Sequence, residues 1–331
     1  MRNFYQGALS PQDIYDWLIA LRGHPRVPVS GFDVTAVFRA RHGERTDYYF
    51  AGVNSENNDH RLSTHGEEGC IASMVTALGK QGEFVEGWCM GAPTHLEKDT
   101  EDELGNITGA CCGKCRQQLA NIARPDMPIH MLSLNGKTRT DRLDKILPNA
   151  FTFREFAPEL ADALQNRCST HDNLNAHDIA HNIMRFAPIS EDEAFEWLSS
   201  LESFDFTSKV SQSVLLTLDN CYVVAGAKVE EAAFVGMSAV QSALANAVAE
   251  FGTVNITNVA TYSYGRDDQT IAPEQFTALP LSSIQCIGEF AKNDDITLTH
   301  FNGYGQTLDI PIYEMAGHIP TIRDTALKKS L

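Results

Sequence analysis

The sequence has few basic residues and no cluster of them. Its 331 residues include 26 Lys and Arg against 43 Asp and Glu, which gives a formal net charge of −17. A chain with this balance repels a phosphate backbone, and no run of Lys and Arg is present to form a local basic patch. We therefore expect no nucleic-acid partner.

Long apolar runs are also missing. No stretch approaches the roughly 18 uninterrupted apolar residues that a membrane span needs, and the amino terminus lacks the basic and apolar segments of a secretory signal. Residues 11–21, PQDIYDWLIAL, have instead the pattern of a short amphipathic helix. We expect a soluble, cytoplasmic protein without a membrane partner.

The eight cysteines do not suit a disulfide framework. Cys111, Cys112 and Cys115 fall within five positions, whereas the other five, at positions 70, 89, 168, 221 and 286, are scattered among apolar residues. Free buried thiols usually have such surroundings. Because an intracellular chain of this size rarely carries structural disulfides, the cluster indicates a metal-binding or catalytic site.

The order of strand and helix patterns predicts an α/β protein. Hydrophobic residues make up 43% of the chain, enough for a packed core. Strand patterns at 32–40 and 46–54 form an expected hairpin, a helix pattern starts near Thr64, and further strands are expected at 83–92 and 127–136. Such alternation is typical of a layered α/β domain.

The same order of patterns returns in the second half of the chain. Residues 48–78 and 222–248 both contain an aromatic strand, Ala-Gly, a Glu, a short loop and a helix, which is a weak internal repeat. We expect four regions, namely an N-terminal helical segment at 1–30, a catalytic domain at 31–155, a helical linker at 156–200 and a degenerate second domain at 201–331.

A candidate zinc site lies in the first copy. His65, Cys112 and Cys115 supply the three ligands of a catalytic zinc, whose fourth position is left for water. Both segments begin helices, where the dipole favours thiolate over thiol. Glu67 would lie beside that water and take its proton. In the alternative, structural interpretation, Thr64 and Glu67 form only a capping box.

The second copy has lost these ligands. Ser238 or Ala239 stands opposite His65, depending on one gap, and no Cys-x-x-Cys follows. We expect this copy to be non-catalytic.

Several motifs resemble those of the cytidine deaminases. The H-x-E and C-x-x-C pair is the signature of zinc nucleobase deaminases. The segments FDVTAV, GVNSEN, HGE, CCGKCRQ and ILPNAF are similar to the family's F-x-V-G-A, G-x-N-x-E-N, H-A-E, P-C-G-x-C-R-Q and L-P-x-x-F. The likeness runs from about Phe32 into the C-terminal region, and it is to the long dimeric form with a degenerate second domain.

The resemblance implies a fold, an activity and roles for residues. The fold would be two three-layer αβα domains, each with a central mixed sheet, joined by a helical linker. The activity would be hydrolytic deamination of cytidine and 2′-deoxycytidine in pyrimidine salvage, by a homodimer with one zinc ion per subunit. His65, Cys112 and Cys115 would bind zinc, Glu67 would move protons, Asn54 and Glu56 would hold the ribose hydroxyls, and Phe32 and Phe151 would pack on the pyrimidine, Phe151 from across the dimer interface.

The chain departs from the family pattern at Thr35, Gly66, Ala110 and Cys111, and it carries an acidic stretch at 94–109 that we expect to be a solvated loop. The departures leave the base preference open, and two rivals to the implied activity also stay open. One is a deaminase of another aminated heterocycle or modified nucleoside. The other is a non-catalytic binding protein with structural zinc and Cys111 as a fourth ligand.

A second histidine pair also resembles a metal motif. HDIAH at 177–181 would place His177 and His181 on one helix face, as in H-E-x-x-H, but no third ligand is evident. A solvated helix face is the preferred interpretation.

Overall fold

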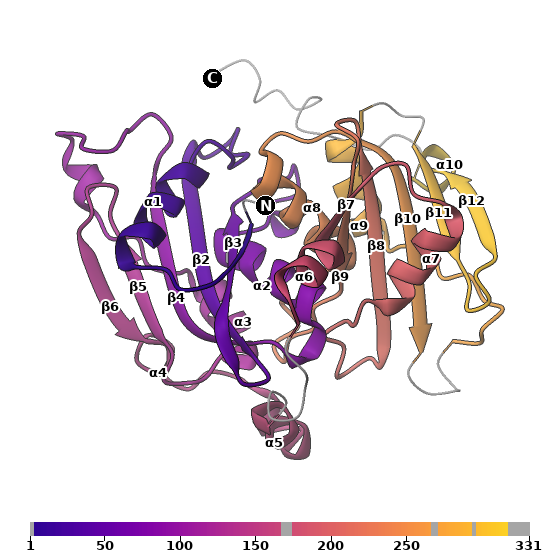
Figure 1. Cartoon of the computed structure of the whole chain (residues 1–331), viewed down its shortest axis with the longest axis horizontal. Helices are drawn as coiled ribbons and strands as arrows, with labels where there is room; N and C mark the ends of the chain where they lie inside the picture. Colours follow the sequence, from indigo (N-terminus) through magenta and orange to yellow (C-terminus); the bar gives the residue numbers. More distant parts are fainter. Residues whose placement is uncertain (1–2, 167–173, 266–270, 293–295, 317–331) are drawn as a thin grey trace.

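The computed structural model describes residues 3–166, 174–265, 271–292 and 296–316, so Cys168 lies outside the described residues (Figure 1). The first half contains strands β1 (Phe4–Gln6), β2 (Phe32–His42), β3 (Arg45–Val53), β4 (Glu83–Pro93), β5 (Pro128–Leu132) and β6 (Thr138–Arg142), with helices α1 (Pro11–Leu21), α2 (Gly66–Leu78), α3 (Gly113–Ile122) and α4 (Leu143–Ile146). Short 3-10 turns are η1 (His60–Leu62), η2 (Gly79–Gln81), η3 (Glu103–Asn106) and η4 (Phe153–Glu155).

The second half follows the same plan. It contains helices α5 (Pro158–Asn166), α6 (Ala176–Ile183), α7 (Glu191–Ser200), α8 (Ala239–Phe251), α9 (Leu281–Phe290) and α10 (Ile312–Ala316), and strands β7 (Met184–Phe186), β8 (Val210–Leu218), β9 (Tyr222–Ala227), β10 (Ile256–Gly265), β11 (Thr297–Phe301) and β12 (Thr307–Pro311).

The two sheets have matching topology. The first has the strand order β1-β3-β2-β4-β5-β6, and the second the order β7-β9-β8-β10-β11-β12. In each sheet one pair is parallel, β4 with β5 and β10 with β11, and the other pairs are antiparallel. These mixed sheets confirm the predicted α/β class with two layered units.

Alternating side chains along the strands give each sheet two apolar faces. On β2, Val37 joins the cluster of Ile14 and Leu18 from α1, whereas the next residue, Phe38, joins the cluster of Ile71 and other α2 residues. Helices therefore cover both faces of the first sheet. The second sheet has α7 on its outer face, where Trp197 and Leu198 pack with Leu215 and Val223.

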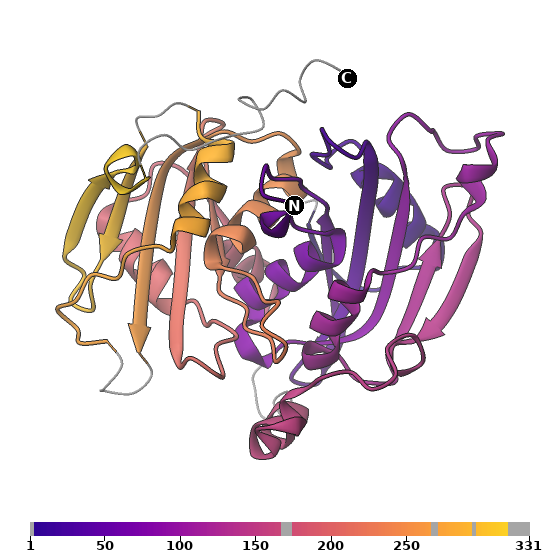
Figure 2. The same cartoon turned by 180° about the vertical axis from the view of Figure 1, so that it is seen from behind.

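Helices α2 and α8 lie between the two sheets and contact each other (Figures 1 and 2). All thirteen residues of α2 are buried. Two hydrogen bonds cross this contact, since the Ser73 hydroxyl donates to Asn246 Oδ1 at 2.7 Å and Asn246 Nδ2 donates to the Thr76 hydroxyl at 3.3 Å. The two halves thus share one interior.

The expected linker at 156–200 contains helices, but parts of it pack with the second sheet. Strand β7 pairs with β9, and α7 covers β8 and β10. The boundaries of the four regions stay a prediction.

Residues 97–104 of the acidic stretch are mostly exposed, as expected for a solvated loop. Among the described residues, no helix has both the length and the apolar character needed to cross a bilayer.

The start of α2 corrects one expectation. The predicted capping box of Thr64 and Glu67 is wrong, because the N-cap is His65, one residue later. The Glu68 carboxylate accepts a hydrogen bond from the His65 backbone N–H at 2.9 Å. Glu67 is therefore not used as a cap.

The backbone of α2 lies directly on β3 at Gly52. A Cβ atom on Gly52 would come within 2.2 Å of the Gly66 carbonyl oxygen and 2.6 Å of the Cys70 nitrogen. Gly226 on β9 has the same contact, where a Cβ would lie 2.2 Å from the Ala243 nitrogen. Because the atoms that each Cβ would meet belong to helix backbone, they cannot move aside without displacing the helix.

We predict that Gly52→Ala pushes α2 away from the sheet and lowers the free energy of unfolding by about 1–3 kcal/mol, as overpacking does. Zinc content of the purified variant should fall with it, since His65 moves with α2. Gly226→Ala is the matched control and should lower stability while zinc content is retained. Denaturant unfolding and metal analysis check both, and equal zinc loss in the two variants would contradict the prediction.

Candidate zinc site and active site

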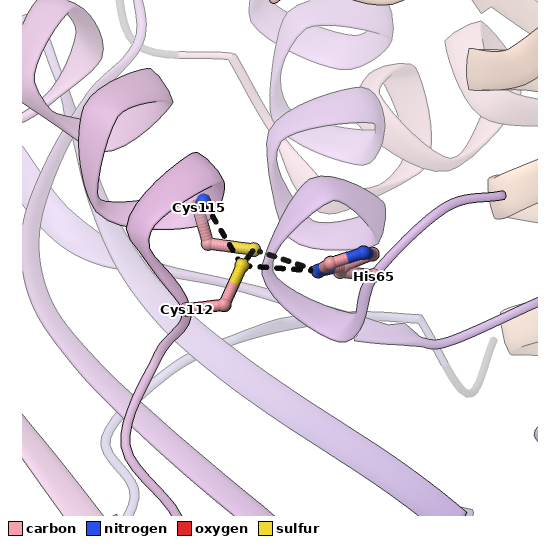
Figure 3. A group of neighbouring side chains, drawn as sticks. All are labelled: His65, Cys112 and Cys115. Atoms are coloured by element: carbon pink, nitrogen blue, oxygen red, sulfur yellow. Dashed lines mark hydrogen bonds between the residues drawn. The ribbon is translucent and has the colours of Figure 1, made fainter. Parts of the chain in front are cut away.

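Two helix starts converge at the candidate zinc site. His65 is the N-cap of α2, Cys112 is the N-cap of α3, and Cys115 lies in the first turn of α3. His65 Nδ1 lies 3.3 Å from both sulfur atoms, and the two sulfurs are 3.5 Å apart (Figure 3). His65 and two cysteines that follow it 47 and 50 positions later therefore form one compact group.

The protonation equilibria of this group favour binding of a cation. Hydrogen bonds with Cys115 and His65 lower the pKa of Cys112 to about 3, because they stabilise the thiolate. The hydrogen bond with Cys112 in turn raises the pKa of His65 and that of Cys115. One imidazole and two sulfurs within 4.8 Å of one another fit the ligand set of a catalytic zinc, which keeps a fourth position open.

Glu67 lies beside this group. It is 3% exposed, and its Oε2 atom is 3.3 Å from Cys115 Sγ. Burial raises the pKa of Glu67, because the charged carboxylate loses its hydration. A raised pKa suits a group that both accepts and donates a proton near neutral pH.

Glu68 was missed in the sequence analysis. It is fully buried and accepts hydrogen bonds from the His65 N–H, from Gln118 Nε2 at 2.7 Å and from Lys114 Nζ at 2.9 Å. It therefore ties the N-terminus of α2 to α3, which carries the cysteines. The signal was present in the sequence, since moving the cap by one residue makes Glu68 the capping acid.

Arg116 and Cys111 do not belong to the ligand group. Arg116 donates to the carbonyls of Cys112 and Ile146 and to neither sulfur. Cys111 is buried and lies with Glu67 and Cys89 in a separate group. Cys111 is therefore not placed to be a fourth ligand of the His65, Cys112 and Cys115 group.

Comparison with known proteins agrees with this chemistry. No family model matches the sequence. Over 126 residues the chain is 28% identical to a cytidine deaminase of Sporosarcina psychrophila, an alignment that covers 38% of this chain and 79% of the relative. This match supports a relationship to the cytidine deaminases for the part of the chain that it covers.

Solved structures of family members were also matched. The cytidine deaminase of Burkholderia pseudomallei is 25% identical with a TM-score of 0.35, covering 43% of this chain and all of the other. The cytidine deaminase of Mycobacterium leprae is 20% identical with a TM-score of 0.32, covering 43% and 100%.

The second repeat of this chain has no ligand at the equivalent places. Helix α8 begins at the N-cap Ser238, which corresponds to His65, so Val240 corresponds to Glu67. Helix α9 begins after Pro280, which corresponds to Cys112, so Ser283 corresponds to Cys115. The structure thus resolves the one-residue ambiguity of the sequence repeat.

Asn54 and Glu56 follow β3, and both bind backbone groups. Asn54 accepts from the Val34 N–H at 2.7 Å and donates to the Phe32 carbonyl at 2.9 Å. Glu56 accepts from the N–H groups of Val29, at 2.7 Å, and Ser30. An amide and a carboxylate retain further hydrogen-bonding capacity beyond these contacts.

Phe32 and Phe151 are both partly exposed, at 40% and 45%. The side-chain amide of Gln117 on α3 donates to the Phe151 carbonyl and accepts from the Phe151 backbone N–H. Gln117 also donates to Glu231 of the second repeat at 2.8 Å. A loop of the second repeat therefore supports the segment that carries Phe151, a connection that the sequence did not indicate.

The histidine pair on α6 has no third ligand in the part of the chain that the structure describes. His177 and His181 share a helix face, with ring centroids 4.0 Å apart, and both are exposed. Neither belongs to a group of three metal-ligating side chains among the described residues.

We predict that Glu68→Ala weakens zinc binding by about tenfold, because the His65 backbone loses its acceptor and α2 its tie to α3. The free energy of unfolding should fall by about 1.5–3 kcal/mol, as for a lost hydrogen bond to a charged group. Lys114→Ala is the control and should change both quantities less. Competition with a zinc-binding dye measures the affinity, and unchanged binding in Glu68→Ala would refute the role.

Proposed function

We propose that the protein is a zinc-dependent hydrolase that deaminates cytidine and 2′-deoxycytidine to the uridines and ammonia. The observation that carries this proposal is the group of His65, Cys112 and Cys115, whose ligand atoms lie within 4.8 Å of one another beside a buried Glu67. The deaminase of Sporosarcina psychrophila, with which the chain shares 28% identity, supports the same reaction class.

The residues have separate tasks in this reaction. His65, Cys112 and Cys115 would hold zinc, which when bound supplies a Lewis acid that makes water acidic and nucleophilic near neutral pH. Glu67 takes one proton from water and gives it to N3 of the base. It then takes the remaining proton of the hydroxyl group on C4 and gives it to the amino group, which departs as ammonia. Its burial keeps the carboxylate out of bulk solvent, so the protons go to the substrate.

The substrate would be held by residues from three segments. Asn54 and Glu56 bind the ribose hydroxyls, and Phe32 and Phe151 pack against the pyrimidine. We further propose a cytoplasmic homodimer with one zinc per subunit, in which Phe151 reaches the partner's site. Sedimentation at working concentration tests the dimer.

We predict that Glu67→Gln retains zinc and loses turnover by about 10²–10⁴-fold, the usual contribution of a general acid–base residue. Glu83→Gln, a buried carboxylate paired with Arg41 at 2.6 Å, is the control and should remain active. Metal analysis and the loss of cytidine absorbance give the two readouts. A Glu67→Gln enzyme with full turnover would reject the proton role.

A substrate panel separates cytidine from other amines. Ammonia released from cytidine and deoxycytidine is expected. Ammonia released only from another aminated heterocycle would indicate a related deaminase that acts on that compound. No ammonia from any substrate, with zinc bound, would favour the non-catalytic alternative.

The repeat offers an internal control for the ribose role. Glu230 accepts hydrogen bonds from Thr207 and Ser208 N–H, as Glu56 does from Val29 and Ser30. We predict that Glu56→Gln raises KM for cytidine, whereas Glu230→Gln lowers only stability. Steady-state kinetics and thermal unfolding check this, and equal changes of KM would show that Glu56 acts only as a loop support.

A further inference from the structure

A second group of metal-ligating side chains adjoins the candidate zinc site through Glu67, whose Oε2 atom is 3.3 Å from Cys115 Sγ. Glu67, Cys89 and Cys111 have ligand atoms within 4.8 Å of one another. The Cys89 and Cys111 sulfurs are 3.5 Å apart. All three side chains are buried, Cys89 being 1% and Cys111 2% exposed.

Three separate elements bring this group together. Cys89 comes from β4, Glu67 from the first turn of α2, and Cys111 from the residue before the N-cap of α3. Position 111 is a departure from the motif that this chain resembles, which has Pro before the first zinc cysteine. Proline has no ligand atom, so the third ligand of this group exists only because of that departure.

The geometry suits a thiophilic cation. Two sulfurs bound at about 2.3 Å to one tetrahedral ion lie about 3.8 Å apart, close to the 3.5 Å observed between Cys89 and Cys111. Sulfur ligands select soft metals over magnesium or calcium. The sulfurs of Cys112 and Cys115, in the candidate zinc site, are also 3.5 Å apart.

We propose that Glu67, Cys89 and Cys111 form a second, inhibitory site for a thiophilic divalent cation such as cadmium or excess zinc. Binding forms two metal–sulfur bonds and one metal–oxygen bond and releases the two thiol protons to solvent. The ion occupies the Glu67 carboxylate, which can then no longer take up a proton. The inhibitory half of this inference rests on the proposed function, whereas the binding half does not.

The test titrates zinc-loaded protein with Cd²⁺. Equilibrium dialysis and analysis of both metals should show one additional cadmium per chain with the first zinc retained, and cadmium–thiolate absorbance should report two further thiolates. Turnover of cytidine should fall by about 10²–10⁴-fold at saturation, as for loss of a general acid–base group.

Two variants decide whether these residues are responsible. Cys89→Ala and Cys111→Pro should each lose the additional cadmium and resist inhibition, relative to their own turnover without cadmium. Cys286→Ala, a buried thiol of the second repeat, should behave as the unchanged chain. Cadmium that only replaces zinc, or an additional ion that both variants still bind, would overturn the proposal. Additional binding lost in the variants, with no deaminase activity in any form, would uphold the site and reject the proposed function.

Discussion

The close contact between helix α2 and strand β3 is the constraint on which the site depends. At Gly52 the helix backbone lies where any side chain would stand, so α2 is fixed against the sheet along its first turn. That turn carries Glu67 and follows His65. Glu68 then joins the same turn to α3 through Lys114 and Gln118. The spacing of the candidate zinc ligands is therefore set by backbone packing and one buried carboxylate.

Much of the first half of this arrangement could be predicted from the sequence. Alternating strand patterns gave the hairpin of β2 and β3, and H-x-E with C-x-x-C gave the candidate ligands, because these signals are local. The cap of α2 was placed one residue early, since Thr64 and His65 both precede an acid at the required spacing. Strands β10, β11 and β12 and helix α9 were not predicted. Gln117 binds both Phe151 and Glu231, and this connection joins distant segments and has no local pattern.

Glu67 lies close to sulfur atoms of two groups. Its Oε2 atom is 3.3 Å from Cys115 Sγ in the candidate zinc site, and its carboxylate lies within 4.8 Å of the Cys89 and Cys111 sulfurs. Cys111 and Cys115 are both buried. The hydrogen bonds with Cys89 and Cys112, respectively, and then burial raise the pKa of the two thiols. A carboxylate in such surroundings is poorly hydrated, which suits proton transfer. The same surroundings attract soft ions, so reactivity and vulnerability to metals arise from one set of side chains.

The burial of α2 against α8 has a consequence for how the sequence of such a chain evolves. Both helices belong to a common interior, so the apolar residues of the second half remain necessary for folding even where its ligands are gone. In a homo-oligomer a substitution appears in every subunit, and therefore at every equivalent site. When two copies of a domain are joined in one polypeptide, each copy can be substituted separately. Ser238 and Val240 could then replace a ligand and an acid without any loss at the intact centre, and selection on this half would act through packing alone.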